Sequence, residues 1–368
     1  MNASAIGENP FTPTFGEVPA HMAGRSVVLN DLKRALSSSK RHPNLTTIIT
    51  GARGTGKTAL LSLAAEEAKQ RGWVAVSTVA LPGMLDDILI STRRVAAHLL
   101  ESESKAKPSS IEVGQLGVGW EAPSQPTNWR NEMTKVLDQL DKTNTGLLIL
   151  VDEVQPNLPD MIQLAAVYQL LVMEGRKVAL LMAGLPHNML MLEADKSVSF
   201  LRRAQKCQLG RIADYDIENA MRKTIEEAGR TIGQDALDAA VRASDGFPFM
   251  MQLVGFRMWD QHPDERAISL TDAEAGIELA RAELRDRIVR ITYESISAGD
   301  KAFLAAMLLD EGSSKVTDIA RRLGKTHSYA TQYKNRLLGQ GIIEKTPDGG
   351  VRFQLPLMRE YVAEATAE

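Results

Sequence analysis

The residues best suited to chemistry lie in the stretch ITGARGTGKTALL, residues 49–61. It contains the pattern G-x-x-x-x-G-K-T, in which Gly51, Gly56, Lys57 and Thr58 are the fixed positions. Glycines let consecutive backbone N–H groups turn toward one anion, and a helix that starts after them offers its positive N-terminus. Lys57 would reach the β- and γ-phosphates of a nucleotide, and the Thr58 hydroxyl would bind Mg²⁺. The expected phosphate-binding residues are Gly51, Ala52, Arg53, Gly54, Thr55, Gly56, Lys57, Thr58 and Ala59.

Two carboxylates follow a second apolar run, LLILVDEVQ. Its apolar residues lead directly into Asp152 and Glu153, and an acidic pair at the mouth of a buried strand is costly to keep there without a cation. The Mg²⁺ of the phosphate loop would supply that cation. Asp152 would hold the ion through water, and Glu153 would polarise the water that attacks the γ-phosphate. The alternative is a strand that merely ends in an acidic turn, but the phosphate loop upstream favours the catalytic interpretation.

Composition excludes several classes of protein. The chain has 368 residues, 44% of them hydrophobic, so it can bury a large core and should form roughly two or three domains. Its net charge of −3 indicates no general attraction to nucleic acid, and its one cysteine, Cys207, cannot form an internal disulfide. The six histidines do not cluster at metal-ligand spacing, so no zinc site is expected. Without a long apolar run or a basic leader, we expect a cytoplasmic protein that makes no membrane contact.

The pattern of elements divides the chain into four regions. Residues 1–25 are irregular and rich in Pro and Gly. Residues 26–210 alternate β-rich runs such as TTIIT and KVALLMAGL with helical ones, which predicts an α/β fold with a parallel sheet and the phosphate loop at a strand's carboxyl end. Residues 211–295 are helical throughout, and residues 296–368 give three helices and a hairpin, the arrangement of a winged helix. The stretch 102–127 contains Ser, Gly and Pro and is expected to be a surface insertion.

Taken together, these features resemble the AAA+ ATPases of the Orc1/Cdc6-like branch. Bacterial stand-alone members that open with an NPF.P.FG segment are similar to this chain, whose N-terminus reads NPFTPTFG. The resemblance implies a P-loop ATPase core, an all-α lid and a winged-helix domain, with ATP and Mg²⁺ as cofactors. It also implies an adenine pocket in the N-terminal segment, although a disordered tail is the alternative there. The residues implied for this pocket are Val18, Pro19, Met22, Gly24 and Arg25.

One departure from the family concerns the residue that senses the γ-phosphate. The strand KVALLMAGLP should end in a polar side chain that faces this phosphate. It ends instead in Ala183, Gly184 and Leu185. Only His187 or Asn188 is then left to serve.

Two further departures concern arginines. The family lid offers an arginine shortly after a glycine, and Phe249 stands there instead. The pattern Gly246-x-Pro248 is closer to the signalling (STAND-like) branch, whose lid proline closes on the nucleotide. Arg202 and Arg203 are candidates for a finger on a neighbouring subunit's ATP, or they are simply solvated. These departures predict slow hydrolysis and favour a switch over a motor.

The C-terminal region has a local excess of positive charge. Between residues 315 and 352 there are eight basic and three acidic residues, in a chain whose net charge is −3. Such asymmetry is expected of a DNA-contacting module on an acidic protein. A helix from about residue 327 to 338 would enter the major groove, with the hairpin near the phosphates. The expected DNA-binding residues are Lys325, Thr326, His327, Ser328, Tyr329, Gln332, Tyr333, Arg336, Lys345 and Arg352.

Two functions from different classes remain open. One is an ATP-controlled protein of initiator or regulatory type that binds double-stranded DNA. The other is a signalling ATPase whose winged helix serves oligomerisation, protein contacts or autoinhibition. A small-molecule kinase fits less well, because it would use neither the helical lid nor the winged helix.

Overall fold

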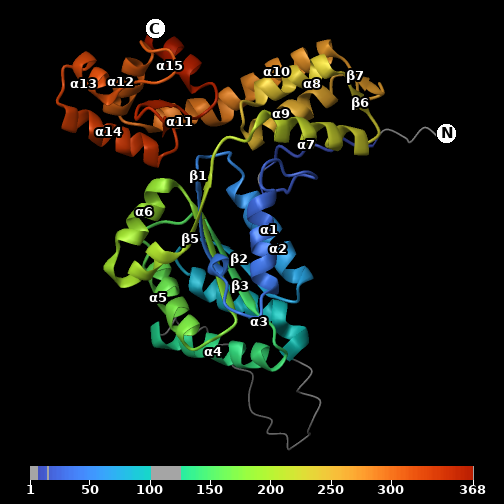
Figure 1. Cartoon of the computed structure of the whole chain (residues 1–368), viewed down its shortest axis with the longest axis vertical. Helices are drawn as coiled ribbons and strands as arrows, with labels where there is room; N and C mark the ends of the chain where they lie inside the picture. Colours follow the sequence, from blue (N-terminus) through green and yellow to red (C-terminus); the bar gives the residue numbers. More distant parts are fainter. Residues whose placement is uncertain (1–6, 15, 101–125, 368) are drawn as a thin grey trace, which may run out of the picture.

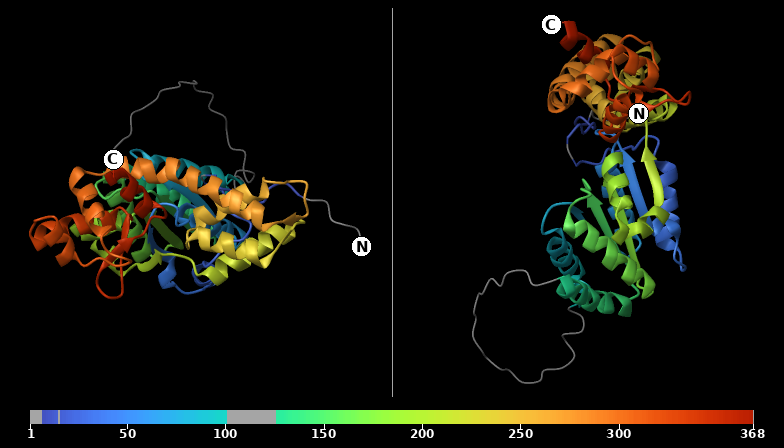
Figure 2. Two further views of the ribbon diagram at one scale, coloured as in Figure 1. Left: turned by 90° about the horizontal axis from the view of Figure 1, so that it is seen from above. Right: turned by 90° about the vertical axis from the view of Figure 1, so that its left-hand side faces the viewer.

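The computed structural model describes residues 7–14, 16–100 and 126–367. Figure 1 shows a sheet-containing part below two helical parts, and the right-hand view of Figure 2 places both helical parts at the same end of the sheet. We call these parts the sheet unit (residues 26–209), the helical unit (214–295) and the C-terminal unit (298–367). The insertion expected at 102–127 lies almost wholly outside the described residues.

The sheet unit is built on five parallel strands in the order β2-β3-β4-β1-β5. Strands β3 (Leu147–Asp152) and β4 (Val178–Gly184) are buried along their whole length, which explains why they read as continuous apolar runs. Strand β1 (Thr46–Gly51) pairs with β4 and β5 and carries the phosphate loop away from the interior of the sheet. The predicted α/β class is confirmed. The other elements are α1 (Ser26–Ser37), α2 (Lys57–Gln70), β2 (Val74–Val79), α3 (Met84–Leu100), α4 (Pro126–Lys142), α5 (Pro159–Met173), α6 (Pro186–Ala194), a 3₁₀ segment (Lys196–Arg203) and β5 (Gln205–Leu209).

Helices cover both faces of this sheet. Successive residues of a strand point to opposite faces, and Ile48 and Ile49 of β1 accordingly belong to two separate clusters of buried apolar residues. The cluster with Ile49 includes Leu60 of α2, and the cluster with Ile48 includes Met161 of α5. The strands and the two helix layers therefore hold the phosphate loop on a rigid base.

The helical unit is dominated by the contact between α9 (Pro248–Trp259) and α10 (Leu270–Leu284). The two helices can approach closely because Gly276 has no side chain. A Cβ at this position would lie 2.5 Å from the backbone nitrogen of Met258. The region expected to be helical throughout also contains a short parallel pair, β6 (Thr231–Ile232) and β7 (Ala267–Ile268). The other elements are α7 (Asp214–Glu227), α8 (Gln234–Ser244), a π-helical segment (Arg285–Val289) and α11 (Arg290–Ser295).

The C-terminal unit begins with three helices and an antiparallel hairpin, and Ser314 forms an additional bridge to Val351 of the hairpin. A final helix, α15, follows the hairpin and was not expected from the sequence. One continuous cluster of buried apolar residues joins this unit to the helical unit, from Phe11 to Val362. The elements are α12 (Ala298–Met307), α13 (Val316–Arg322), α14 (His327–Gly339), β8 (Ile343–Lys345), β9 (Val351–Phe353) and α15 (Met358–Ala367).

An ion pair joins Asp310, in the turn after α12, to Arg322 at the end of α13. Arg322 donates to both carboxylate oxygens, at 2.5 and 2.6 Å, and to the carbonyl of Ala306 at 2.8 Å. The hydrogen bonds from Arg322 lower the pKa of Asp310 to about 2. Because the pKa is lowered on folding, the pair stabilises the protein above about pH 4, the ordinary value for aspartate, and this stabilisation is lost as the pH falls through about 2.

Asp310→Asn should therefore lower the free energy of unfolding at pH 7 by about 1–2 kcal/mol. The difference from the unaltered protein should shrink as the pH falls from 4 toward 2. Chemical denaturation at several pH values measures both effects. Glu311→Gln, at the exposed neighbouring position, is the matched control and should leave stability unchanged. A difference that stays constant down to pH 2 would contradict the assignment.

Candidate nucleotide-binding site

A cavity of about 680 Å³ lies at the carboxyl end of β1. Four separated parts of the chain line it together with Glu153: the N-terminal segment, the phosphate loop, the start of α9 and the junction of α10 with α11. The lining residues from the loop are Arg53, Gly54, Thr55, Gly56, Lys57, Thr58 and Ala59. Gly51 and Ala52, which were also expected to bind phosphate, are not among the residues that line the cavity.

The loop adopts a conformation that depends on its glycines. Gly54 and Gly56 have φ angles of 77° and 85°, which other residues rarely adopt, and α2 begins directly afterwards at Lys57. The Lys57 ammonium is buried and donates to the carbonyls of Gly51 at 3.1 Å and Ala52 at 2.8 Å. Burial lowers its pKa, although Glu153 nearby acts in the opposite direction. Lys57 is therefore held beside the anion-binding backbone, where a phosphate can replace the carbonyls as its partner.

The two candidate Mg²⁺ ligands are in direct contact. The Thr58 hydroxyl donates to Asp152 Oδ2 at 2.6 Å, across 94 residues of sequence. The other carboxylate oxygen, Oδ1, accepts from the backbone N–H of Glu153 at 2.8 Å. A hydroxyl and a carboxylate placed together at the mouth of a phosphate loop are the oxygen ligands that Mg²⁺ prefers. The residues present therefore fit a Mg²⁺ ion that accompanies nucleotide phosphates.

The backbone of Glu153 is in an unusual conformation. Its φ is +52°, in the left-handed region that non-glycine residues seldom occupy. The residue is exposed and lines the cavity, whereas Asp152 beside it is buried. Strained backbone of this kind concentrates at functional sites, because surrounding structure has to enforce it. The turn after β3 thus keeps one carboxylate at the metal position and sends the next into the cavity.

The N-terminal segment is anchored on α9, although Phe15 and residues 1–6 lie outside the described part. Phe11 is buried against Gly255, where a Cβ would lie 2.3 Å from its ring. Asn9 donates to the carbonyl of Phe256 at 3.0 Å, and the N–H of Thr12 donates to Gln252 at 3.0 Å. The described part of this segment is therefore fixed to the helical unit and forms a wall of the cavity.

Residues expected around the base have different positions. Pro19, Met22 and Arg25 line the cavity, and Val18 is not among its lining residues. The buried Arg25 guanidinium donates to the carbonyls of Thr55, at 3.3 Å, and Gly210, at 3.0 Å. Burial lowers its pKa. Arg25 thus ties the phosphate loop to the segment after β5, a role that the sequence did not suggest.

At the start of α9, Pro248 and Phe249 line the cavity over the loop. The N–H of Phe249 donates to the carbonyl of Gly54 at 3.3 Å. A Cβ on Gly56 would lie 3.8 Å from Pro248. The helical unit therefore rests directly on the phosphate loop, with the N-terminus of α9 facing the cavity.

Neither candidate for the γ-phosphate sensor lines the cavity. Asn188 donates to the carbonyl of Val154 at 2.9 Å and so holds the turn after β3. His187 is exposed and lies against α14, where a Cβ on Gly339 would be 2.3 Å from its own. Arg202 and Arg203 are also exposed and do not line the cavity, and Arg202 donates to the carbonyl of Glu193 at 3.0 Å.

Two of the expected DNA-binding residues make contacts inside the C-terminal unit. Arg336 donates to Asp300 and Ser297, each at 2.8 Å, and stacks on Tyr333 at 4.6 Å from the ring centroid. The Tyr333 ring packs on Gly299, where a Cβ would lie 2.3 Å away. The start of α12 therefore engages both side chains, although 41% of the Arg336 side chain remains exposed.

Several other expected DNA-binding residues also lie at the surface. Lys325, His327 and Lys345 are exposed. Tyr329 is half-buried between the Tyr333 ring, at 4.5 Å, and the ammonium of Lys325, at 5.5 Å. Arg352 is exposed and pairs with Glu344 at 2.6 Å. The exposed Lys325, His327 and Lys345 are thus accessible to an external partner.

The C-terminal unit also touches the phosphate loop, which the sequence did not reveal. A Cβ on Gly341 would lie 2.7 Å from the Cα of Ala52, and Figure 1 shows α14 above α6. A small cavity of about 70 Å³ lies at this contact, with Arg53, Thr292 and Gln340 among its lining residues. Arg53 and Thr292 line the large cavity as well. The two cavities are therefore adjacent and are separated by Arg53 of the loop and Thr292 of α11, which line both.

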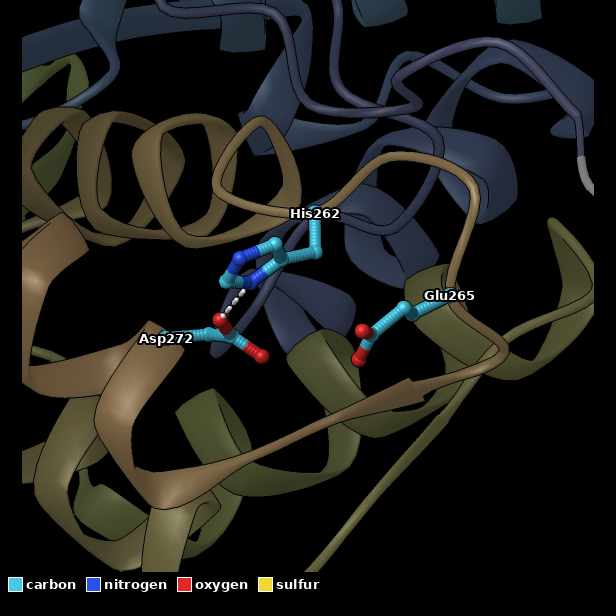
Figure 3. Close-up of side chains that lie close together, drawn as sticks. All are labelled: His262, Glu265 and Asp272. Atoms are coloured by element: carbon cyan, nitrogen blue, oxygen red, sulfur yellow. Dashed lines mark hydrogen bonds and ion pairs between the residues drawn. The ribbon is translucent and has the colours of Figure 1, made fainter.

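A second polar cluster lies in the helical unit (Figure 3), where His262, Glu265 and Asp272 bring potential ligand atoms within 4.8 Å of one another. His262 contacts the Asp272 carboxylate at 2.6 Å, and this hydrogen bond raises the pKa of the imidazole. Asp272 also accepts from the N–H and hydroxyl of Ser269 and so caps α10. The cap and the contact with His262 account for the buried Asp272 carboxylate.

Comparisons with known proteins agree with the site. Residues 21–182 match the family described as "AAA ATPase domain", and residues 286–362 match one described as "Domain of unknown function (DUF8462)". No curated protein is a significant match to the chain. Among the described residues, no helix combines the length and apolarity that crossing a bilayer requires.

Solved structures share the fold at low sequence identity. The Walker-type ATPase PABY2304 of Pyrococcus abyssi is 13% identical, with a TM-score of 0.63, over 93% of this chain and 96% of that one. The ORC2 protein of Aeropyrum pernix in its ADP form is 14% identical, with a TM-score of 0.56, over 98% of each chain. The expected resemblance to AAA+ ATPases, with ATP and Mg²⁺ as cofactors, is confirmed. Residues 21–182 thus match an AAA ATPase domain, and the chain shares its fold with the two ATPase structures named above.

Proposed function

We propose that this protein is a slow, ATP-operated switch whose nucleotide state controls its C-terminal unit. Residues 26–210 serve as the ATPase core, residues 211–295 as the lid and residues 296–368 as a winged helix, with residues 1–25 closing the adenine side. The observation that carries the proposal is that the lid and the C-terminal unit both contact the phosphate loop, at Gly54 and Ala52. A conformational change of the loop on ATP binding or hydrolysis would therefore displace both the lid and the C-terminal unit.

Each residue of the site has a distinct role. The loop N–H groups and Lys57 bind the phosphate chain, and Thr58 with Asp152 holds Mg²⁺, which neutralises charge on the β- and γ-phosphates. Glu153 accepts the proton of the attacking water, because it is the exposed carboxylate beside the metal position. Arg202 and Arg203, exposed and outside the cavity, are suited to a neighbouring subunit's nucleotide in a homo-oligomer.

Slow turnover follows from what surrounds the phosphates. His187 and Asn188 make other contacts, and the lid places an aromatic ring, Phe249, where the family has an arginine. Positive charge and hydrogen-bond donors aimed at the γ-phosphate provide much of the acceleration in phosphoryl transfer. A site with fewer of these groups should hydrolyse bound ATP slowly, so that the ATP-bound state persists.

Lys57→Ala should weaken ATP binding by roughly 30- to 150-fold, because a charge-assisted hydrogen bond of about 2–3 kcal/mol is lost. The fold should survive, since the substitution removes a buried charge. Isothermal titration measures the affinity and circular dichroism the fold. Lys69→Ala, on the exposed side of the same helix, is the control. Equal affinity in the two variants would refute the role of Lys57.

Glu153→Gln should reduce ATP hydrolysis by roughly 100-fold or more while ATP still binds, because only the base is lost. Single-turnover measurements with radiolabelled ATP separate binding from hydrolysis. Glu66→Gln, an exposed change of the same kind on α2, should hydrolyse normally. Normal hydrolysis in Glu153→Gln would show that another group activates the water.

Double-stranded DNA is the partner that we propose for the C-terminal unit. The basic excess of this stretch and the accessible Lys325, His327 and Lys345 support this choice. These groups lie on the N-terminal side of α14 and on the hairpin, whereas the other end of α14 lies against α6 and the loop. DNA on one end of α14 would therefore be coupled to nucleotide at the other.

Lys325→Ala/Lys345→Ala should weaken DNA binding and reduce the salt dependence of log K by about 2, because each phosphate contact contributes about one unit. Fluorescence anisotropy with duplex DNA at several salt concentrations, with and without ATP, measures both. Lys40→Ala/Lys196→Ala removes the same charge from exposed positions of the sheet unit and is the control. ATP hydrolysis should be normal in both.

A signalling ATPase is the second candidate, and the contact of Gly339 and Gly341 with His187 and Ala52 favours it. In that case the C-terminal unit restrains the loop and meets protein partners when it is released. Absence of DNA binding by the unaltered protein at low salt would decide for this alternative.

A further inference from the structure

Arg287 lines the nucleotide cavity although it belongs to neither motif. It lies in the π-helical segment between α10 and α11, where the helical unit passes into the C-terminal unit. Ile288, Ile291 and Thr292 line the cavity with it. Residues at this spacing share one side of a helix, so the inter-unit junction presents a whole face to the nucleotide.

The π-helical turn decides which side chains form that face. Such a turn adds one residue to an α-helix, and each residue advances the helix by about 100°. Without it, the side chains after the turn would be rotated out of the cavity by about that angle. The side chain of Ile291 is 53% exposed in the cavity wall, which is where a bound nucleotide would cover it. The turn is thus a feature of the site.

The charge of Arg287 is available to a ligand. The guanidinium contacts Glu283 at 2.7 Å, and its side chain is 60% exposed. Arg257 also binds Glu283, because it donates twice to the other carboxylate oxygen, Oε2, at 2.8 and 2.5 Å. Arg287 can therefore leave Glu283 without stranding a charge, because Arg257 remains as its partner. The anionic part of ATP is its phosphate chain, so the phosphates are the part of the nucleotide that would attract an arginine in this cavity.

We propose that Arg287 leaves Glu283 when ATP binds and contacts the phosphate chain, so that the junction helix supplies the charge that the lid lacks at Phe249. This inference rests on the proposed ATP site. The α10–α11 junction would then contact the nucleotide directly and respond to whether ATP or ADP is bound. The junction is followed in the chain by α12 of the C-terminal unit.

Two substitutions separate this role from a structural ion pair. Arg287→Ala should lower ATP affinity about tenfold and ADP affinity less, because ATP carries the additional charge. Glu283→Gln should raise ATP affinity about two- to threefold, because it removes the competitor for Arg287. If the pair were only structural, both substitutions would break the same contact and change affinity in the same direction. Arg287→Lys should restore part of the affinity.

Titration calorimetry with ATP and ADP provides the measurement, and thermal unfolding checks that the variants fold. Arg290→Ala is the matched control, because Arg290 is the next arginine, is half-exposed, and does not line the cavity. Equal losses in Arg287→Ala and Arg290→Ala, or equal losses for ATP and ADP, would overturn the proposal. Lys57→Ala tests the ATP site itself, so full ATP affinity in that variant would overturn the site and not only the role of Arg287.

Discussion

The loop between Gly51 and Lys57 must keep a row of backbone N–H groups pointed at one anion, and the rest of the structure depends on this constraint. Its glycines take φ angles that a side chain would strain, so the loop needs support from outside. The buried Arg25 binds the carbonyl of Thr55, the N–H of Phe249 binds that of Gly54, and Lys57 ties the loop to its own beginning. Segments far apart in sequence therefore meet on seven residues of loop.

This convergence supports the proposed coupling between the nucleotide and the C-terminal unit. The helical and C-terminal units share one apolar core, so they respond together to a force at their common edge. That edge touches the loop at Ala52 through Gly341, and it lines the cavity through the α10–α11 junction. At Gly341 the two backbones approach so closely that a displacement of the loop at Ala52 would press on the C-terminal unit.

Much of the ATPase fold could be predicted from local pattern. Buried parallel strands are continuous apolar runs, and the phosphate loop has a spacing that few other structures require. The contact between Thr58 and Asp152 follows from these two facts, since parallel strands end at the same edge of the sheet. The α/β class, the parallel sheet and the resemblance to AAA+ ATPases could all be predicted from these local patterns.

Long-range packing decided what the pattern could not. The pairing of Arg336 with Asp300, the contact of His187 with Gly339 and the approach of Arg287 to the cavity depend on the relative orientation of helices that are distant in sequence. The sequence pattern around a basic residue on a helix is the same whether its side chain faces solvent, a carboxylate or a nucleotide. Charge and periodicity give the face of a helix but not its partner. The sequence by itself determined the phosphate loop, its acidic partners and the sheet, because these are local or follow from strand order. Only the tertiary structure decided which side chains remain free for ligands, because that depends on which neighbours the packing of the three units supplies.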